Sequence, residues 1–203
     1  MKNICSVTGC SSFVHGNNYC KRHYYQSRTD KGVTTNTRTK RDPNNFVVIG
    51  KDCFIELYDA RGNILAATVI DAADIDLVKH FKWRFLSAKR YVHSWKGKAY
   101  IHNIITGSIG IDHIDGNPLN NRRANLRLAS TSQNGMNRGK QANNTSGFKG
   151  VLFDKRAGRW MARICVNRKV KHVGYFHDAH SAALAYNEAA THHHGVFAKL
   201  NEI

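Results

Sequence analysis

The chain has 203 residues, 41% of them hydrophobic, which is enough to bury a core and excludes disorder throughout. Lys and Arg number 31 against 14 Asp and Glu, a formal net charge of +17 that all parts of the chain share. This excess favours a polyanionic partner. No apolar run approaches the roughly 18 residues of a membrane helix, and no apolar signal segment opens the sequence. We therefore expect a soluble, cytoplasmic protein with no membrane partner.

Two polar segments without apolar periodicity predict the domain organisation. Residues 28–45, rich in Thr, Asn and basic side chains, predict a basic linker, and residues 137–146 predict a second linker. They separate an N-terminal module, a middle module and a C-terminal module, which span residues 1–27, 46–136 and 147–203. The predicted fold class is α+β, built of several small modules.

Three of the five cysteines lie in the N-terminal module, in the pattern Cys5-x4-Cys10-x9-Cys20-x2-His23. An odd, clustered set of cysteines favours metal binding over disulfides. Three thiolates and one imidazole make a tetrahedral set that suits Zn²⁺. Because four protein ligands leave no open position for a substrate, we expect a structural zinc ion that replaces a hydrophobic core here. The alternative is four unconnected residues in a loop.

The middle module begins with a predicted β meander over residues 46–69, where the stretches FVVIG, FIELYD and ILAATV alternate apolar and polar residues. Residues 74–81 have helical spacing, and Trp83 is expected in the core. Basic residues interleaved with aromatic ones then follow without an acidic residue, a pattern that favours contact with a nucleic-acid backbone. These residues are Lys79, Lys82, Arg84, Lys89, Arg90, Tyr91, Trp95, Lys96, Lys98 and Tyr100.

Polar side chains concentrate in residues 111–137, IDHIDGNPLNNRRANLRLASTSQNGMN. A strand that ends at Asp112-His113 is expected first, followed by a turn at 116–118, a returning strand at 125–128 and a capped helix start at 130–133. Taken alone, the pair Asp112-His113 beside a turn could serve only to satisfy hydrogen bonds of the loop.

His113, Asn125 and Asn134, with Asp112 before the first of them, resemble the HNH endonuclease motif. The resemblance implies a ββα-metal fold in which His113 is the general base that deprotonates the attacking water. It further implies that Asp112 and Asn134 hold a divalent metal, and that Asn125 holds the hairpin loop and orients the base. Two oxygen ligands, which leave the other coordination positions of the metal vacant, favour Mg²⁺ or Mn²⁺ over zinc at this site.

Other residues near the motif are candidates for secondary roles. His102 lies in the segment AYIHNII, which resembles the segment before the motif in phage HNH proteins, and a buried, hydrogen-bonded histidine is the alternative. Three arginines of the loop and returning strand are interpreted as phosphate clamps, because guanidinium groups pair with phosphate bidentately. They are Arg122, Arg123 and Arg127, and solvated loop arginines are the alternative.

The C-terminal module has the pattern of three strands followed by a helix. Strand-like runs at 148–153, 159–166 and 169–176 precede an Ala-rich helix that Asp178 caps and that ends before Gly195. The segment GFKGV, Trp160, the run GYF at 174–176, the Ala pairs of the helix and the final AKLN resemble the plant ethylene-response-factor, or APETALA-type, DNA-binding domain.

That resemblance implies a three-stranded antiparallel sheet, packed on one helix, that lies in the DNA major groove. Exposed strand residues are then candidates for DNA contact: Lys149, Arg159, Arg163, Lys169, Lys171 and His172. Leu152 and Cys165 differ from the residues that plant relatives often have at these positions, so the DNA sequence that those relatives recognise does not carry over to this module.

Together these patterns predict a phage-type HNH endonuclease, homing or free-standing, that acts in a bacterial or phage-infected cell. We expect it to hydrolyse a phosphodiester of double-stranded DNA, leaving 5′ phosphate and 3′ hydroxyl, and to need no small-molecule substrate. One centre per chain predicts nicking by a monomer on DNA. The alternative is a sequence-specific DNA-binding regulator with an inactive HNH module. An RNA-binding protein fits the charge but not the major-groove sheet.

Overall fold

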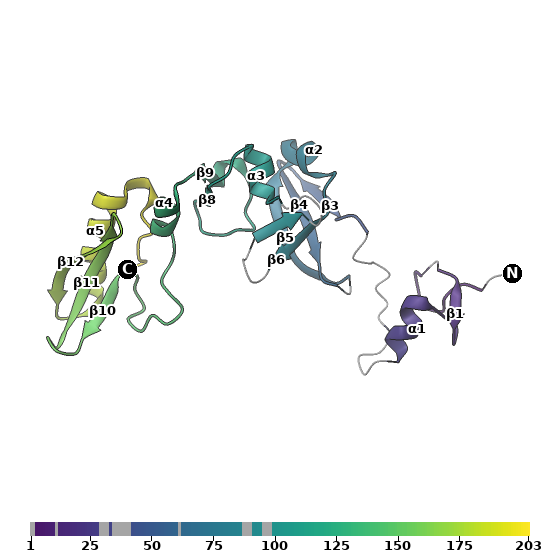
Figure 1. Ribbon diagram of the computed structural model, residues 1–203, viewed down its shortest axis with the longest axis horizontal. Helices are drawn as coiled ribbons and strands as arrows, with labels where there is room; N and C mark the ends of the chain where they lie inside the picture. The colour runs from purple at the N-terminus through teal and green to yellow at the C-terminus, as the bar shows by residue number, and fades with distance from the viewer. Residues whose placement is uncertain are drawn as a thin grey trace.

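The computed structural model describes residues 3–10, 12–28, 33, 42–60, 62–86, 91–94 and 99–203. Within these ranges the chain forms several small antiparallel sheets with few helices, which confirms the α+β prediction (Figure 1). No helix in the described ranges is long and apolar enough to cross a membrane.

The N-terminal module consists of a short hairpin and one helix: β1 (Val14–Gly16), β2 (Tyr19–Cys20) and α1 (Lys21–Ser27). Asn17 and Asn18 connect the two strands with φ angles of 47° and 62°. Asn tolerates this left-handed conformation, which fits the right-handed twist of a tight hairpin. The turn therefore places Cys20 at the end of β2, directly before the helix that carries His23.

The middle module opens with the predicted meander: β3 (Phe46–Ile49), β4 (Asp52–Tyr58) and β5 (Ile64–Asp71), paired in that order. Alternate residues of β4, namely Cys53, Ile55 and Leu57, are fully buried, as expected for a strand with one face on a core. Asn44 belongs to this module as well, because its amide donates to the Glu56 and Trp83 carbonyls at 2.8 and 3.0 Å. The predicted linker of residues 28–45 therefore ends earlier than expected, and most of it lies outside the described residues.

Short elements close the core of the middle module. They are η1 (Ala72–Asp74), α2 (Ile75–Val78), β6 (Trp83–Leu86), β7 (Tyr91–Ser94) and α3 (Ile101–Thr106). Trp83 is 1% exposed and donates its indole N–H to the Val78 carbonyl, so its predicted core position is confirmed. The helix expected over 74–81 is shorter than predicted, and helix α3 was not predicted.

A hairpin and a helix end the middle module, as the sequence predicted. Strands β8 (Ile111–His113) and β9 (Leu126–Leu128) pair with Asp112 opposite Arg127, and a single turn, η2 (Arg123–Asn125), precedes β9. Helix α4 (Thr131–Met136) begins with a capping box, in which Ser130 accepts from the Gln133 N–H and the Gln133 side chain accepts from the Ser130 N–H.

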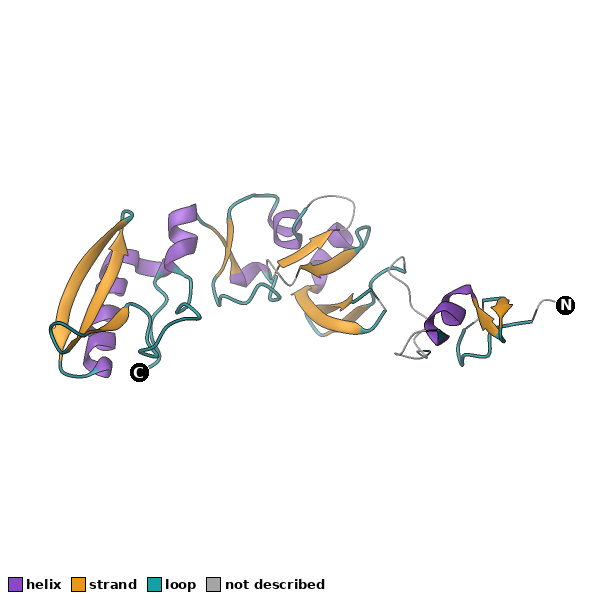
Figure 2. Ribbon diagram, turned by 60° about the horizontal axis from the view of Figure 1, so that its bottom comes forward, coloured by secondary structure: helices purple, strands orange, loops and turns teal. Residues whose placement is uncertain are grey.

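The C-terminal module is a three-stranded sheet with one helix across its face (Figure 2). The strands β10 (Val151–Asp154), β11 (Arg159–Val166) and β12 (Lys169–Phe176) pair in sequence order. Helix α5 (Ala179–His194) starts at the predicted cap Asp178 and ends at Gly195, where η3 (Gly195–Phe197) follows. Small residues let the helix lie close to the sheet, and the fully buried ones are Ala182, Ala183 and Ala190.

Gly150 is needed where the chain enters β10, and this explains why that strand starts later than the predicted 148. Its φ is +75°, and a Cβ there would lie 2.2 Å from the Tyr186 ring and 2.7 Å from the Arg163 carbonyl.

We expect Gly150→Ala to lower the free energy of unfolding by about 1–3 kcal/mol through this overlap, beyond the strain of its φ. Gly158→Ala is the matched control, because Gly158 has a φ of +62° but nothing within 4 Å. Hydrogen exchange of the α5 amides measures both, and equal losses would contradict the predicted overlap.

Candidate active site on the hairpin and helix

The structure brings Asp112, His113 and Asn134 to one cavity of about 360 Å³. Strand β8 supplies the first two residues and helix α4 the third. The remaining lining residues come from β7, the hairpin loop and the segment after α4: Tyr91, Gly116, Pro118, Asn137, Arg138 and Gly139. Both Asp112 and His113 are 4% exposed, so the two side chains are held inside the module rather than in a solvated loop.

A chain of hydrogen bonds fixes the ring of His113. The Thr68 hydroxyl donates to the Leu119 carbonyl at 2.8 Å, so its oxygen accepts the Asn121 amide N–H at 2.8 Å. The amide oxygen of Asn121 therefore faces His113, 3.1 Å from Nε2. An amide oxygen can only accept, so Nε2 carries the proton and Nδ1 is the unprotonated nitrogen.

Burial favours the neutral form of this imidazole, and aromatic rings pack around it. Burial lowers the pKa of His113 below its usual value, although the Asn121 hydrogen bond and the nearby carboxylates act in the opposite direction. His102 packs edge-on against His113, with ring centroids 5.1 Å apart, and Tyr91 lies 6.0 Å away. Burial, followed by the charge of His113, lowers the pKa of His102 to about 4. The candidate His102 thus belongs to the site as a neutral ring beside the candidate base.

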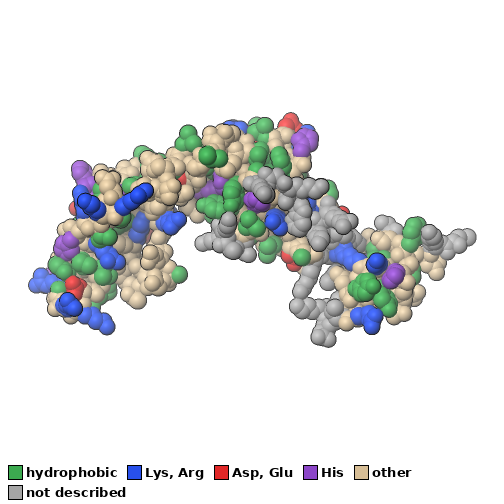
Figure 3. Space-filling model, viewed as in Figure 1, with side chains coloured by type: hydrophobic (Ala, Val, Ile, Leu, Met, Phe, Trp, Pro, Cys, Tyr) green, Lys and Arg blue, Asp and Glu red, His purple; other side chains and the backbone are tan. Residues whose placement is uncertain are grey.

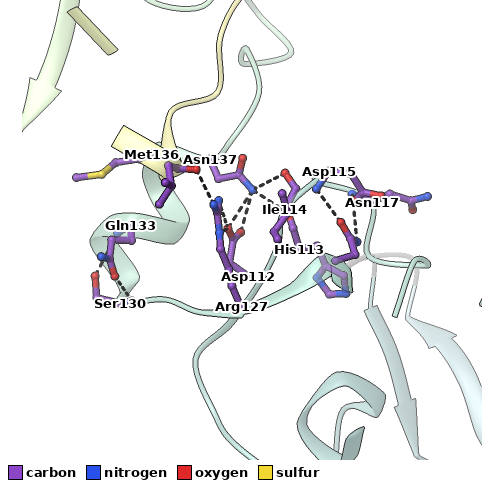
Figure 4. Close-up of polar contacts among 12 residues, drawn as sticks. Asp112, His113, Ile114, Asp115, Asn117, Arg127, Ser130, Gln133, Met136 and Asn137 are labelled. Carbon is purple, nitrogen blue, oxygen red and sulfur yellow. Dashed lines mark hydrogen bonds and ion pairs between the residues drawn. The ribbon is translucent and has the colours of Figure 1, made fainter. Parts of the chain in front are cut away.

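Asp112 is held on both sides (Figure 4). Arg127, its partner across the hairpin, donates Nε and an Nη to the Oδ2 atom at 2.9 and 2.7 Å. The Asn137 amide donates to both carboxylate oxygens at 3.1 Å and to the His113 carbonyl at 2.8 Å. Arg127 also reaches the C-terminal module, where it donates to the Val196 carbonyl at 2.6 Å and stacks 4.0 Å from the centre of the Phe197 ring. The Oδ1 atom of Asp112 thus keeps acceptor capacity toward the cavity.

Asn125 lies outside the cavity lining and organises the hairpin loop. Its oxygen accepts the Asp115 N–H at 3.0 Å, and its amide donates to the Asp115 carboxylate and the Asn120 carbonyl at 2.9 and 2.8 Å. Asp115 in turn accepts from the Asn117 N–H at 2.7 Å. The loop that carries His113 and Asn121 is therefore closed by the Asn125 side chain.

The three arginines predicted as phosphate clamps all have carboxylate partners in the structure. Arg122 forms a bidentate ion pair with Asp52, and Arg123 pairs with the buried Asp74 at 2.8 Å. Arg127 pairs with Asp112, as described above. These ion pairs use the guanidinium forks that phosphate would need, so the interpretation as free clamps does not match the geometry. The arginines instead tie the hairpin loop to β4, η1 and β8.

A second site lies in the N-terminal module, where Cys5, Cys10, Cys20 and His23 converge with their donor atoms within 4.8 Å of one another. The His23 Nδ1 atom is 3.2 Å from the Cys5 sulfur and 3.5 Å from the Cys20 sulfur, and the Cys10 and Cys20 sulfurs are 3.9 Å apart. Ligands bound tetrahedrally at zinc distances lie about 3.4–3.8 Å apart. The four residues therefore could hold a metal ion, and the alternative of unconnected loop residues is not supported.

The sheet register divides the predicted DNA-contact residues of the C-terminal module between two faces. Arg163 pairs with His172 on the face away from α5, and Arg159 shares that face by alternation along β11. Lys171 pairs with the buried Ile164 and Lys169 with Val166, so these two lysines lie on the helix side. Lys149 precedes β10, and its ammonium donates to the Met136 carbonyl. The six candidate residues therefore do not share one surface.

Part of the basic and aromatic surface predicted for the middle module cannot be placed, because Lys89, Arg90, Trp95, Lys96 and Lys98 lie outside the described residues. Tyr91 and Tyr100 are described, and they pack against each other with ring centroids 5.7 Å apart. These two aromatic residues thus belong to the packing around His102 and His113.

A buried Asp-His pair on a β-hairpin that leads into a helix is the arrangement that the HNH resemblance implied. A family model described as HNH endonuclease matches residues 108–136. Over 176 residues the chain is 30% identical to the uncharacterized HNH endonuclease L560 of Acanthamoeba polyphaga mimivirus, which covers 82% of this chain and 90% of that protein. The chain therefore belongs to the HNH endonuclease family.

Two further relatives match parts of the chain. Protein 3.8 of Escherichia phage T7 is 34% identical over 91 residues, which are 45% of this chain and 73% of that protein. The AP2-like ethylene-responsive transcription factor TOE2 of Arabidopsis thaliana is 40% identical over 57 residues, 28% of this chain and 12% of that protein. No solved structure matches.

Sequence reasoning missed Asn121 and Asn137, the two amides that hold His113 and Asp112. Asn121 is fully buried and Asn137 is 6% exposed. Both stand in polar stretches, NNRR and NGMN, that have the composition of exposed loops. Nothing in that composition distinguishes them from solvated neighbours, because their partners are distant in the chain.

Proposed function

We propose that the protein is a metal-dependent endonuclease that hydrolyses a phosphodiester of double-stranded DNA at the cavity of Asp112, His113 and Asn134. The observation that supports this proposal is that His113, whose Nδ1 atom is unprotonated, and the Asp112 carboxylate, whose Oδ1 atom accepts only from Asn137, line the same cavity as Asn134. Nicking of supercoiled plasmid by the intact protein with Mg²⁺ or Mn²⁺ tests it.

His113 acts as the general base in this proposal. Its Nδ1 atom takes the proton of the attacking water, and Asn121 keeps the proton on Nε2 and the ring in place. General base catalysis by a neutral imidazole typically supplies about 10²- to 10⁴-fold in rate. Asn125 maintains the loop that positions both residues, as its contacts to Asp115 and Asn120 indicate.

Asp112 and Asn134 are the residues that would hold the catalytic metal. Both offer hard oxygen atoms, which fit Mg²⁺ or Mn²⁺ better than zinc, and Arg127 and Asn137 hold the Asp112 carboxylate in place. When bound, such a cation would stabilise the charge that develops on the phosphate and the leaving 3′ oxygen. The products of this reaction are a 5′ phosphate and a 3′ hydroxyl.

The outer modules bind DNA in this proposal. The C-terminal module is assigned to the APETALA type on the partial match to a plant factor and on its sheet-and-helix architecture. The N-terminal module is assigned a structural zinc ion.

One catalytic centre per chain supports a monomer that nicks one strand. A sequence-specific DNA-binding regulator with an inactive HNH module is the second candidate. The basic charge and the partial match to a plant transcription factor suit it as well as the nuclease, and the cavity that Asp112, His113 and Asn134 line argues against it.

We expect Cys20→Ser to remove the zinc ion and unfold only the N-terminal module. Burial opposes ionisation of the Cys5 thiol, but the amides of Cys20 and Val7 and the His23 and Cys10 side chains outweigh it and lower the pKa of Cys5 to about 6. Burial raises the pKa of the Cys20 thiol, so a bound cation would be needed to stabilise both thiolates together. Elemental analysis should find one zinc ion per intact chain and none in the variant. Hydrogen exchange should rise in residues 3–28 alone, because metal binding free energy is folding free energy in such modules.

Cys165→Ser is the matched control, since the Cys165 thiol is exposed and distant in sequence from the cluster. Equal zinc content in the intact protein and Cys20→Ser would refute the zinc assignment without affecting the nuclease proposal.

A further inference from the structure

A groove of about 860 Å³ lies between α4 and the C-terminal sheet. Helix α4 and residues 138–145 form one wall, and the residues around the entry of β10 and the β11–β12 hairpin form the other. The groove is basic: its lining includes five Lys or Arg residues and no Asp or Glu. These five are Arg138, Lys140, Lys149, Arg163 and Arg168. Figure 3 shows Lys and Arg side chains gathered over the C-terminal module.

The cations of the groove differ from the arginines of the hairpin in their partners. Arg122, Arg123 and Arg127 are neutralised by carboxylates, whereas none of the five groove cations forms an ion pair within the described residues. Lys140 and Lys149 donate only to carbonyls, those of Gly147 and Met136. The positive charge of the groove is therefore available to an anion from outside.

Lys149 is the groove cation that is most affected by burial. Burial, followed by the charge of Lys199, lowers the pKa of Lys149 to about 8. An ammonium group held in such surroundings gains from an arriving phosphate, because the phosphate replaces the hydration that burial has removed.

The groove joins the candidate active site to the outer face of the sheet. Arg138 and Gly139 line both the groove and the cavity of His113. At the other end, Arg163 lines the groove and also stands beside His172 on the sheet face away from α5. One basic path therefore leads from the nuclease cavity, along α4, to the sheet.

We propose that this groove holds the phosphate backbone of the DNA strand that continues from the cleaved bond, with Arg138, Arg168 and Lys149 as its principal contacts. The inference rests on the proposed function, since it assumes DNA as the substrate. The proposal assigns the phosphate contacts to the basic residues of the groove instead of the arginines of the hairpin. Three of these residues, Arg138, Lys140 and Arg168, were not among the DNA contacts expected from the sequence.

The test compares Arg138→Gln and Arg168→Gln with Arg122→Gln in the full chain. Affinity for a short duplex is measured by fluorescence anisotropy at several salt concentrations, without added divalent metal so that the DNA stays intact. Each phosphate contact contributes about 0.9 to the slope of log affinity against log salt. We expect each groove variant to reduce the slope by about that amount and Arg122→Gln, the same charge change at a paired site, to leave it unchanged.

Unchanged slopes in both groove variants, or an equal fall in Arg122→Gln, would overturn the proposal and assign the groove to something other than the DNA backbone. The melting temperature of each variant shows that folding is retained. Failure of this inference is distinct from failure of the nuclease proposal. A protein that cuts DNA with unaltered slopes disproves only the groove, and a protein whose slopes fall as expected but that never cuts disproves only the nuclease.

Discussion

His113→Ala should lose about 10²- to 10⁴-fold in the rate of DNA cleavage while it binds DNA as tightly as the intact protein. The loss follows because His113 lines the cavity and its neutral imidazole, held through Nε2 by Asn121, has an unprotonated Nδ1 atom. Single-turnover cleavage of a labelled duplex measures the chemical step, and anisotropy measures binding.

His102→Ala is the informative comparison for this prediction. His102 is also a buried, neutral imidazole, with its ring 5.1 Å from that of His113, but it does not line the cavity. We expect a smaller loss there, from poorer packing of His113. A His113→Ala variant that cuts at the rate of the intact protein would remove His113 from the role of base.

Asn121→Leu should lose a large part of the rate enhancement that His113 supplies as general base, even though Asn121 does not touch the DNA in this account. The substitution keeps the size of the side chain but removes the acceptor for His113 Nε2 and the donor to Thr68. The imidazole is then free to change its protonated nitrogen or to turn, so we expect about 10²-fold slower cleavage, with kcat affected rather than KM. The unsatisfied Thr68 oxygen adds about 1–3 kcal/mol of destabilisation.

The matched control for Asn121→Leu is the same substitution at the neighbouring residue, Asn120→Leu. The Asn120 side chain bonds Asp115 and Arg122 but not His113. We expect its cleavage rate to stay within a few-fold of the intact protein, since the His113 contacts are preserved. If Asn120→Leu and Asn121→Leu lose rate equally, the loop as a whole supports activity and Asn121 has no specific role in orienting the base.

Local patterns in the sequence predicted the hairpin and helix of the site well. Ser130 and Gln133 lie three residues apart and cap α4 reciprocally, so the helix start depends on neighbours that the sequence displays together. The convergence of the N-terminal cysteines on His23 was predictable for the same reason, because metal ligands follow a spacing pattern. The capping contact spans three residues, and the contacts of the cysteine cluster span up to 18 but join residue types whose spacing is itself the signal.

Contacts between distant residues explain what the sequence could not predict. Asn121 bonds Thr68, 53 residues earlier, and Asn137 bonds Asp112, 25 residues earlier. Arg122 meets Asp52, 70 residues before it, so its pairing was invisible in the loop sequence that suggested a phosphate clamp. The faces of β12 likewise depend on its register with β11, where an irregularity after Ala162 shifts the pairing.

The most direct test of the nuclease account is nicking of a supercoiled plasmid that carries the genomic neighbourhood of the protein's own gene. The reaction is run at low salt, with Mg²⁺, with Mn²⁺ and without divalent metal, because binding of so basic a protein falls steeply with ionic strength. The account predicts open-circular DNA with either metal and none without. Intact plasmid under every metal condition, together with a retained gel shift of the same DNA, would contradict it and favour the DNA-binding regulator.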